Sequence, residues 1–117
     1  MRATFAKRER IKKRSDFLKL FKYGRKIKNQ YFIANYFKNN LSVSRLGITV
    51  SKKIGNAVER NRNKRIIREY YRLNKYKFSQ NWDMNIVVIK KDISNSYLNF
   101  KLSLKEIFDL IERNALN

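Results

Sequence analysis

The sequence contains no cysteine and no histidine. Without cysteine the chain cannot form disulfides or a thiolate zinc site, and a reducing cytoplasm is compatible with that composition. Without histidine it lacks the side chain that most often serves as a general acid or base near neutral pH. An active site on the protein would therefore need carboxylates, lysine or tyrosine.

Acidic residues are also scarce, with 9 Asp and Glu against 29 Lys and Arg. They are spread singly along the chain, and only Glu106, Asp109 and Glu112 are near neighbours, on the outer face of a predicted late helix. A two-metal nuclease needs several carboxylates that converge on ions about 4 Å apart. The spacing therefore disfavours a self-sufficient nuclease.

Proline is absent, and so is any long apolar run. No segment approaches the roughly 18 apolar residues of a transmembrane helix, and the N-terminus lacks the apolar core of a signal peptide. We therefore expect a soluble, cytoplasmic protein without a membrane partner. A length of 117 residues predicts a single domain.

What the chain has in abundance is positive charge, with a net charge of +20. Such self-repulsion is tolerable when phosphates supply the counter-charge, so the composition predicts a nucleic-acid partner. Most of the charge lies in residues 1–28 and 52–77, whereas residues 81–117 contain equal numbers of basic and acidic side chains.

The stretch SKKIGNAVERNRNKRIIREYYR at 51–72 concentrates this charge. Gly55 is predicted to take a left-handed turn, and Asn56 to cap a helix from Ala57 to about Arg72. At helical spacing Asn61, Lys64, Arg65, Arg68 and Arg72 share one face, with Ile66, Tyr70 and Leu73 opposite and Ile67 and Tyr71 widening the apolar side. A solvated helix face is the alternative, but so one-sided a row of arginines favours binding to phosphate.

The N-terminal segment 1–14 is basic without a sustained period and is predicted to be a mobile or loosely attached arm, with Phe5 and Ile11 as the residues that could pin it. Ser15 is predicted to cap a short helix over residues 16–22 that ends before Gly24. Phe17 and Phe21 are i, i+4 neighbours on this helix. Their default interpretation is core packing, and partial exposure for stacking on bases is the alternative.

Strands are predicted at 25–29, 31–38 and 45–51. In YFIANYFK both alternating faces are apolar enough to be covered, so alternation does not decide which face meets the helices. A fourth strand, at 84–90, contains the run IVVI and suits a parallel pairing with 45–51 across the central helix. A right-handed crossover is the usual expectation for such a unit. Ser96 is predicted to cap a last helix that ends at about Arg113 and serves as structural cover, with these apolar residues at helical spacing: Phe100, Leu104, Ile107, Phe108 and Ile111.

Two segments resemble a known family. GNAVERNRNKRIIREYYR at 55–72, preceded by VSKK at 50–53, is similar to the signature of the bacterial ribonuclease P protein component, whose central helix carries an Arg-Asn-Arg motif. RERIKKRSDFLKLFKYG at 8–24 resembles the same family. The family pattern often has an aromatic residue where this chain has Asn35, which puts the sheet's share of any stacking surface in doubt.

The resemblance implies an RNA-binding subunit whose partners are the catalytic ribonuclease P RNA and precursor tRNA, with no small-molecule substrate. Cleavage of the 5′ leader would be carried out by the RNA and its Mg²⁺ ions, with no catalytic group on the protein. Residues matching the family's site for the catalytic RNA are Arg60, Asn61, Arg62, Lys64, Arg65, Arg68 and Arg72. Those matching its leader site are Phe17, Phe21, Ser51, Lys52, Lys53 and Lys90.

The predicted fold is α+β, a single domain of residues 1–117 with a four-stranded, mostly antiparallel sheet in the order α-β-β-β-α-β-α. The resemblance implies an uncommon left-handed βαβ crossover. A second RNA site is predicted between the first helix and the sheet, with Lys52, Lys53, Lys90 and Lys91 on a shared rim. A structural ribosomal or rRNA-binding protein is the alternative function, because the same charge and fold would serve it.

Overall fold

The computed structural model describes residues 5–91 and 97–114. A 3₁₀ turn, η1 (Lys7–Glu9), and helix α1 (Arg14–Tyr23) precede three strands, β1 (Arg25–Lys28), β2 (Phe32–Lys38) and β3 (Arg45–Val50). Turn η2 (Lys52–Ile54) leads into the long helix α2 (Ala57–Asn74), followed by η3 (Lys75–Lys77), β4 (Trp82–Val88) and α3 (Leu98–Arg113). The predicted order of elements is confirmed.

The strands form one sheet in the order β1-β2-β4-β3. β1 with β2 and β2 with β4 are antiparallel, whereas β3 and β4 are parallel, as the sequence predicted. β4 begins and ends two residues earlier than predicted. The reason is its register with β2, which pairs Trp82 with Lys38 and Val88 with Phe32.

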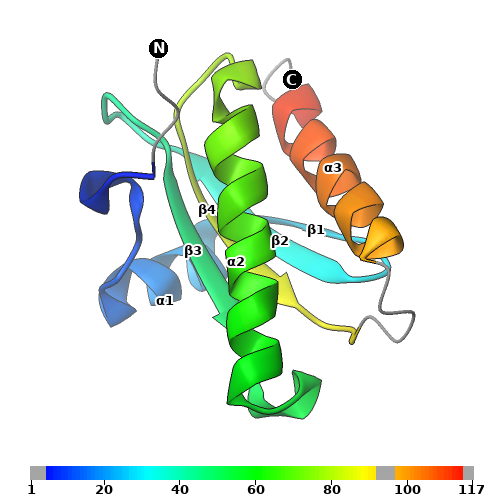
Figure 1. Cartoon of the computed structure of the whole chain (residues 1–117). Helices are drawn as coiled ribbons and strands as arrows, with labels where there is room; N and C mark the ends of the chain where they lie inside the picture. Colours follow the sequence, from blue (N-terminus) through cyan, green and yellow to red (C-terminus); the bar gives the residue numbers. More distant parts are fainter. Residues whose placement is uncertain (1–4, 92–96, 115–117) are drawn as a thin grey trace.

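The connection from β3 through α2 to β4 is left-handed. In Figure 1, β3 and β4 both run downward, α2 lies in front of the sheet, and β4 lies to the right of β3 on the side of β2. A strand, a helix and a strand arranged in this way turn in the left-handed sense, against the usual preference. The handedness implied by the family resemblance is therefore confirmed.

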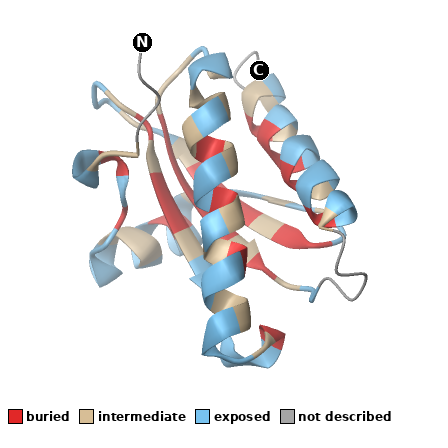
Figure 2. Ribbon diagram, viewed as in Figure 1, coloured by how far each residue is buried: buried red, intermediate tan, exposed pale blue. Residues whose placement is uncertain are grey.

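Helices α2 and α3 cover one face of the sheet, and α1 lies against the other (Figure 1). The alternating residues Phe32, Ala34 and Tyr36 of β2 are buried on the side of α2 and α3. Figure 2 shows the buried positions along the strands and the inner sides of these two helices, while α1 is mostly exposed. One face of the sheet is therefore closed core, and the other is only partly covered.

Helix α1 begins at Arg14, so the prediction that Ser15 is its cap is wrong. The N-cap position is Lys13, whose carbonyl accepts from the amide of Asp16 at 3.0 Å, and no side chain caps the helix. The Asp16 carboxylate instead lies 3.6 Å from the guanidinium of Arg45 on β3. At the other end the amide of Gly24 donates to the carbonyl of Leu20.

Helix α2 begins at a capping box, which confirms Asn56 as its cap. The Asn56 side chain accepts from the amide of Glu59 at 2.9 Å, and the Glu59 carboxylate accepts from the amide of Asn56 at 3.4 Å. Gly55 is extended, with φ 161° and ψ −170°, so the predicted left-handed turn is wrong. Glycine is needed here for space, because a Cβ would lie 2.8 Å from Cδ of Glu59 as it folds back to the cap.

Residues 5–13, here called the arm, are attached to the sheet. Ile11 is buried and its amide donates to the carbonyl of Leu46 at 3.0 Å. The carboxylate of Glu9 is also buried, with both oxygens 2.8 Å from Nζ of Lys75. The expectation that Phe5 and Ile11 pin this segment is therefore confirmed, because Ile11 is buried and the ring of Phe5 packs edge-on against Tyr71. The mobility of segment 1–14 stays a prediction.

The closing helix α3 follows Tyr97, which has a positive φ of 58°. The predicted cap, Ser96, lies outside the described residues. The inner face of α3 packs on the sheet through Phe100, Leu104, Ile107, Phe108 and Ile111, as predicted. Within 5–91 and 97–114, none of the helices has the length and apolarity that crossing a bilayer requires.

Candidate nucleic-acid interface

The orientation of α2 is set by the side chains that it buries. Asn63, Ile67 and Tyr71 face the sheet, whereas Leu73 is 48% exposed, so the apolar face is rotated from the predicted one centred on Ile66, Tyr70 and Leu73. The Tyr71 hydroxyl donates to the carbonyl of Ser44 at 3.2 Å, and burial raises the pKa of this phenol. The rotation occurs because Ile67 and Tyr71 are buried in the core, where the ring of Tyr71 contacts the rings of Phe5 and Phe108.

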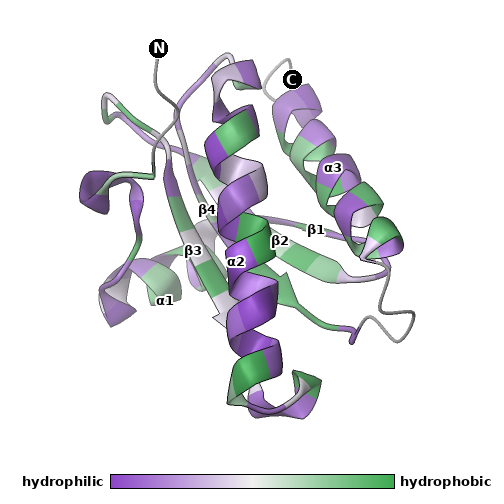
Figure 3. Cartoon of the chain, in the orientation of Figure 1, coloured by the Kyte–Doolittle hydropathy of each residue, from purple (hydrophilic) through white to green (hydrophobic). Residues whose placement is uncertain are grey.

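Five polar side chains of α2 form a row beside the arm, here called the basic ridge, in which Asn61, Arg65 and Arg68 are exposed and Lys64 and Arg72 are half-buried. The hydrophilic side of α2 is evident in Figure 3. Two predicted members lie elsewhere. Arg62 stacks over the ring of Tyr97 at 5.0 Å, on the side of α3, and Arg60 is half-buried with Nε lacking a hydrogen-bond partner.

Part of the charge on the ridge is neutralised within α2. Arg72 forms an ion pair with Glu69, and the hydrogen bond from Arg72 lowers the pKa of that carboxyl. Lys64, Arg65 and Arg68 form no ion pair with any residue in the described part of the chain. These three therefore carry most of the charge that the ridge can offer to a phosphate.

The opposite, partly covered face of the sheet forms a second site together with α1. Helix α1 is anchored by Leu20, which is 1% exposed, and by Asp16, which contacts Arg45. Arg45 in turn donates to both oxygens of the buried Asp83 at 2.9 and 2.5 Å, and this hydrogen bonding raises the pKa of the guanidinium. The position of α1 over the sheet is thus fixed by a network of charges.

Between α1 and the sheet lies a groove of about 380 Å³, here called the aromatic groove. Basic side chains from α1 and β1 lie beside it, aromatic and aliphatic side chains form its walls, and polar side chains of the sheet form part of its floor. Its lining is Arg14, Phe17, Leu18, Phe21, Lys26, Ile33, Asn35, Thr49, Asn85 and Val87.

The two phenylalanines of α1 differ in their packing. Phe21 is 67% exposed, and Nζ of Lys26 lies 5.1 Å from the centre of its ring. Phe17 is half-buried, and its ring lies so close to Gly47 that a Cβ there would be 2.5 Å from Cε1. Core packing is therefore wrong as an interpretation of Phe21, while Phe17 both packs on β3 and faces the groove.

The floor of the aromatic groove contains an unusual polar group. Asn35 and Asn85 are direct cross-strand partners, and the Thr49 hydroxyl donates to Oδ1 of Asn85 at 3.1 Å. Oδ1 of Asn35 is buried and has no hydrogen-bond partner. A buried acceptor without a donor costs about 1–3 kcal/mol of folding free energy. The amides of Asn35 and Asn85 make this part of the groove floor polar, without an aromatic ring on which a base could stack.

The predicted lysine rim is not part of this groove. Ser51, Lys52 and Lys53 are exposed just beyond β3, and Nζ of Lys90 lies 5.5 Å from the ring of Tyr31, which packs against Phe100 of α3. Lys91 instead pairs with Glu59 at 2.8 Å. Because β3 and β4 are parallel, the lysines that follow them do lie at the same end of the sheet, but this end is not beside Phe17 and Phe21.

Sequence reasoning missed the cations that do border the groove, Arg14 and Lys26. Lys26 belongs to a basic strand at one end of the sheet, and only the pairing of β1 with β2 places it beside Phe21. The sequence analysis placed Arg14 in the N-terminal segment 1–14 rather than in the first helix. The only available signal was its position three residues before Phe17, which places both on one helix face.

The arrangement of the acidic side chains bears on metal binding by the described part of the chain. Among residues 5–91 and 97–114, no three acidic side chains come close enough together to hold a metal ion. The described surfaces thus present cations, aromatic rings and amides, which bind phosphates and bases, rather than the converging carboxylates of a hydrolytic site.

Comparison with known proteins finds one family throughout. The family model described as Ribonuclease P matches residues 5–113. The chain is 48% identical to the ribonuclease P protein component of Desulforapulum autotrophicum, with 94% of each chain covered, and 37% identical to that of Thermotoga maritima, with 97% of each covered. It also resembles the solved ribonuclease P proteins of Staphylococcus aureus (TM-score 0.82, 33% identity, 89% and 95% covered) and T. maritima (0.75, 36%, 90% and 96%).

Proposed function

This chain belongs to the ribonuclease P protein component family, and we propose that its basic ridge binds the RNA subunit while its aromatic groove holds the 5′ leader of precursor tRNA. Membership makes it a subunit of a tRNA-processing ribonuclease. The observation that carries the proposal is the separation of two surfaces on opposite faces of the sheet. One is a row of cations with a single half-buried ring, Phe5, beside it, and the other combines an exposed phenylalanine with flanking cations.

In this mechanism the protein positions the leader and neutralises RNA phosphates, and the RNA performs the cleavage. Lys64, Arg65 and Arg68 supply counter-charge to phosphates of the RNA subunit, which lowers the cost of bringing a second polyanion close. Phe21 and Phe17 offer ring faces on which leader bases stack. Leader contacts of this kind raise affinity for precursor over mature tRNA, because only the precursor has a leader.

Mg²⁺ would be bound mainly by the RNA, and it would supply the activated water and stabilise charge on the scissile phosphate. In this proposal the chain would contribute to metal binding indirectly, and the lack of converging carboxylates among residues 5–91 and 97–114 supports that role. By neutralising RNA phosphates the ridge allows the folded RNA to hold its metal ions at a lower free concentration. We place this activity in the cytoplasm.

The alternative of a structural ribosomal or rRNA-binding protein is not favoured, because the family match spans 5–113. Its physical basis was charge and fold alone, which many RNA-binding proteins share. The scattered acidic residues disfavour a nuclease active without RNA.

A cleavage assay tests the proposal. Precursor tRNA is incubated at low and high Mg²⁺ with protein alone, with a bacterial ribonuclease P RNA alone, and with both. We expect no cleavage by the protein alone, cleavage by the RNA at high Mg²⁺, and rescue by the protein at low Mg²⁺. Cleavage by protein alone would show a nuclease, and absence of rescue would contradict the proposed subunit mechanism.

A further inference from the structure

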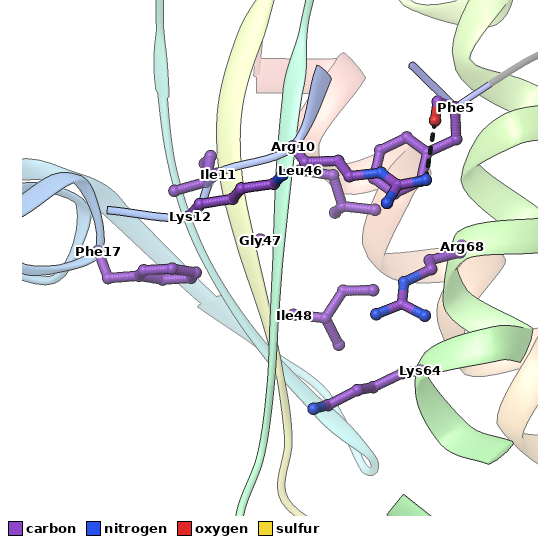
Figure 4. Close-up of a pocket in the computed structure, with 10 residues that line it drawn as sticks. All are labelled: Phe5, Arg10, Ile11, Lys12, Phe17, Leu46, Gly47, Ile48, Lys64 and Arg68. Carbon is purple, nitrogen blue, oxygen red and sulfur yellow. Dashed lines mark hydrogen bonds between the residues drawn. The ribbon is translucent and has the colours of Figure 1, made fainter. Parts of the chain in front are cut away.

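Two basic side chains of the arm belong to neither surface described above. Arg10 and Lys12 project from the arm toward α2, and Lys64 and Arg68 project from α2 toward the arm (Figure 4). All four line a groove of about 190 Å³ that crosses the edge strand β3, here called the edge groove. It is smaller than the roughly 300–1,000 Å³ pockets that hold small molecules, which suits a single charged group.

The position of Arg10 in this groove is fixed by its neighbours. Its guanidinium carbon lies 4.7 Å from the centre of the Phe5 ring, and Nη2 donates to the carbonyl of Phe5 at 3.1 Å. The adjacent Glu9 forms an ion pair with Lys75, and the backbone of Arg10 forms a parallel β-bridge with Leu46. Because Phe5 takes a single N–H, most of the guanidinium donors remain available to a ligand.

The edge groove has no counter-charge of its own. No acidic residue lines it, and none of Arg10, Lys12, Lys64 and Arg68 forms an ion pair with a residue in the described part of the chain. Holding four cations around one small groove destabilises the fold through their mutual repulsion. An anion bound between them would replace this repulsion by attraction. Two guanidinium forks match the oxygens of a phosphate.

We propose that the edge groove is a phosphate clamp, in which Arg10 of the arm and Arg68 of α2 hold the same RNA backbone phosphate, with Lys12 and Lys64 beside it. This rests on the proposed function, since RNA is the ligand. Phe17 lines both the edge groove and the aromatic groove, so the clamp lies between the ridge and the leader site. The RNA subunit and the precursor leader both carry the required phosphodiester, and the experiment separates these two sources.

A double-mutant cycle tests the clamp. Affinities of the wild type, Arg10→Ala, Arg68→Ala and the double variant are measured for the RNA subunit and, on the assembled complex, for precursor and mature tRNA. If the two arginines share a phosphate, each single variant weakens binding about tenfold and the double variant no more than a few-fold further, because charged hydrogen bonds contribute about 1.5–3 kcal/mol. The salt slope of the double variant falls by about 1 rather than 2.

The RNA that shows the coupling identifies the source of the phosphate. Coupling in binding to the RNA subunit assigns the phosphate to that subunit, and coupling confined to precursor tRNA assigns it to the leader. Arg8→Ala is the matched control, because Arg8 is an exposed cation of the same arm that does not line the edge groove. It should leave all affinities within about twofold.

Additive effects of Arg10→Ala and Arg68→Ala, or losses from Arg8→Ala equal to those from Arg10→Ala, would overturn the clamp. Loss of binding from Arg68→Ala but not from Arg10→Ala would overturn it while leaving the ridge intact. No effect of either variant on any RNA would refute the proposed ridge as well. Hydrogen exchange at the Ile11 amide shows whether the arm stays attached, and if Arg10→Ala releases it, Arg10→Gln replaces it in the cycle because it retains a stem over Phe5.

Discussion

The basic ridge and the aromatic groove lie on opposite faces of one sheet, and the helices that carry them differ in how much apolar surface they bury. Behind the ridge, α2 packs on a closed core, so its outer side chains are free to be charged. Over the groove, α1 is anchored mainly by Leu20 and one charge network, so the sheet beneath it remains partly accessible. A rigid element with a complete core thus carries charge, and a lightly anchored one leaves room for a strand of RNA.

The two proposed sites would also differ in selectivity. Phosphate binding by the ridge would be independent of sequence and would depend strongly on salt. Stacking in the groove would depend on unpaired bases and much less on salt. Each difference can be tested by a substitution that alters one surface and spares the other.

The largest effect is expected on the ridge. Arg65→Ala with Arg68→Ala should weaken binding of the RNA subunit about 10–100-fold, because two charged contacts to phosphate are lost. The slope of log affinity against log salt should fall by up to about 2. Lys77→Ala with Lys101→Ala removes the same charge from outside both surfaces and serves as the control. An unchanged slope in the folded arginine variant would contradict phosphate binding by the ridge.

The next effect distinguishes the groove from the ridge. Phe21→Ala should weaken precursor tRNA binding about tenfold, since stacking contributes about 1–3 kcal/mol per base, and should leave mature tRNA and the RNA subunit unaffected. Because Phe21 is 67% exposed, its melting temperature should stay within about a degree of wild type. Phe17→Ala should show the same selectivity with a measurable loss of stability. Uniform weakening of every RNA would mean that the phenylalanines only pack.

A smaller effect is expected where the groove meets β3. Gly47→Ala places a methyl group 2.5 Å from Cε1 of Phe17, and the ring must move. Overpacking of this kind costs typically about 1–3 kcal/mol, and urea unfolding measures it. Leader affinity should fall with it while affinity for the RNA subunit is retained. Full stability of the variant would show that Phe17 is free to swing away from the sheet.

Loosening the start of α2 should affect the ridge alone. Asn56→Ala removes the cap of the helix and should lower the free energy of unfolding by about 1 kcal/mol. Affinity for the RNA subunit should fall by no more than a few-fold, because the ridge residues lie within the helix, and leader binding should not change. A loss of leader affinity larger than the loss for the RNA subunit would show that the two surfaces are coupled through α2.

The smallest effect concerns the charge of Glu59. Hydrogen bonds from Lys91 and from the amide of Asn56 lower the pKa of this carboxyl in the folded protein. Because the pKa is lower in the folded state, ionised Glu59 stabilises the fold at pH values above the unfolded pKa of about 4.3. This stabilisation is lost as the pH falls through the folded pKa. Glu59→Gln retains the capping geometry, so its melting temperature should be slightly below wild type at pH 7 and should become equal to it only as the pH falls below the folded pKa of Glu59. A difference that persists in acid would indicate lost packing.

Much of the fold followed from local patterns. The number and order of the strands, the cap at Asn56 and the inner face of α3 depend on period and on neighbours in the chain, and the structure agrees. The conformation of Gly55 did not follow, because the reason for glycine is the side chain of Glu59 folding back, not a turn. The partners of the arm, Leu46 and Lys75, did not follow either, because they are distant in sequence.

The sequence by itself determined that this chain binds a polyanion, that a helix at 57–74 carries a one-sided cationic row, and which family it resembles, because charge and helical period are local properties. Only the tertiary structure decided which cations act together. It turned Arg62 toward Tyr97 and Lys90 toward Tyr31, and it brought Lys26 beside Phe21 and Arg10 opposite Arg68. The physical reason is that sheet pairing and helix rotation are fixed by burial of distant apolar side chains, and that burial sets where each charge points.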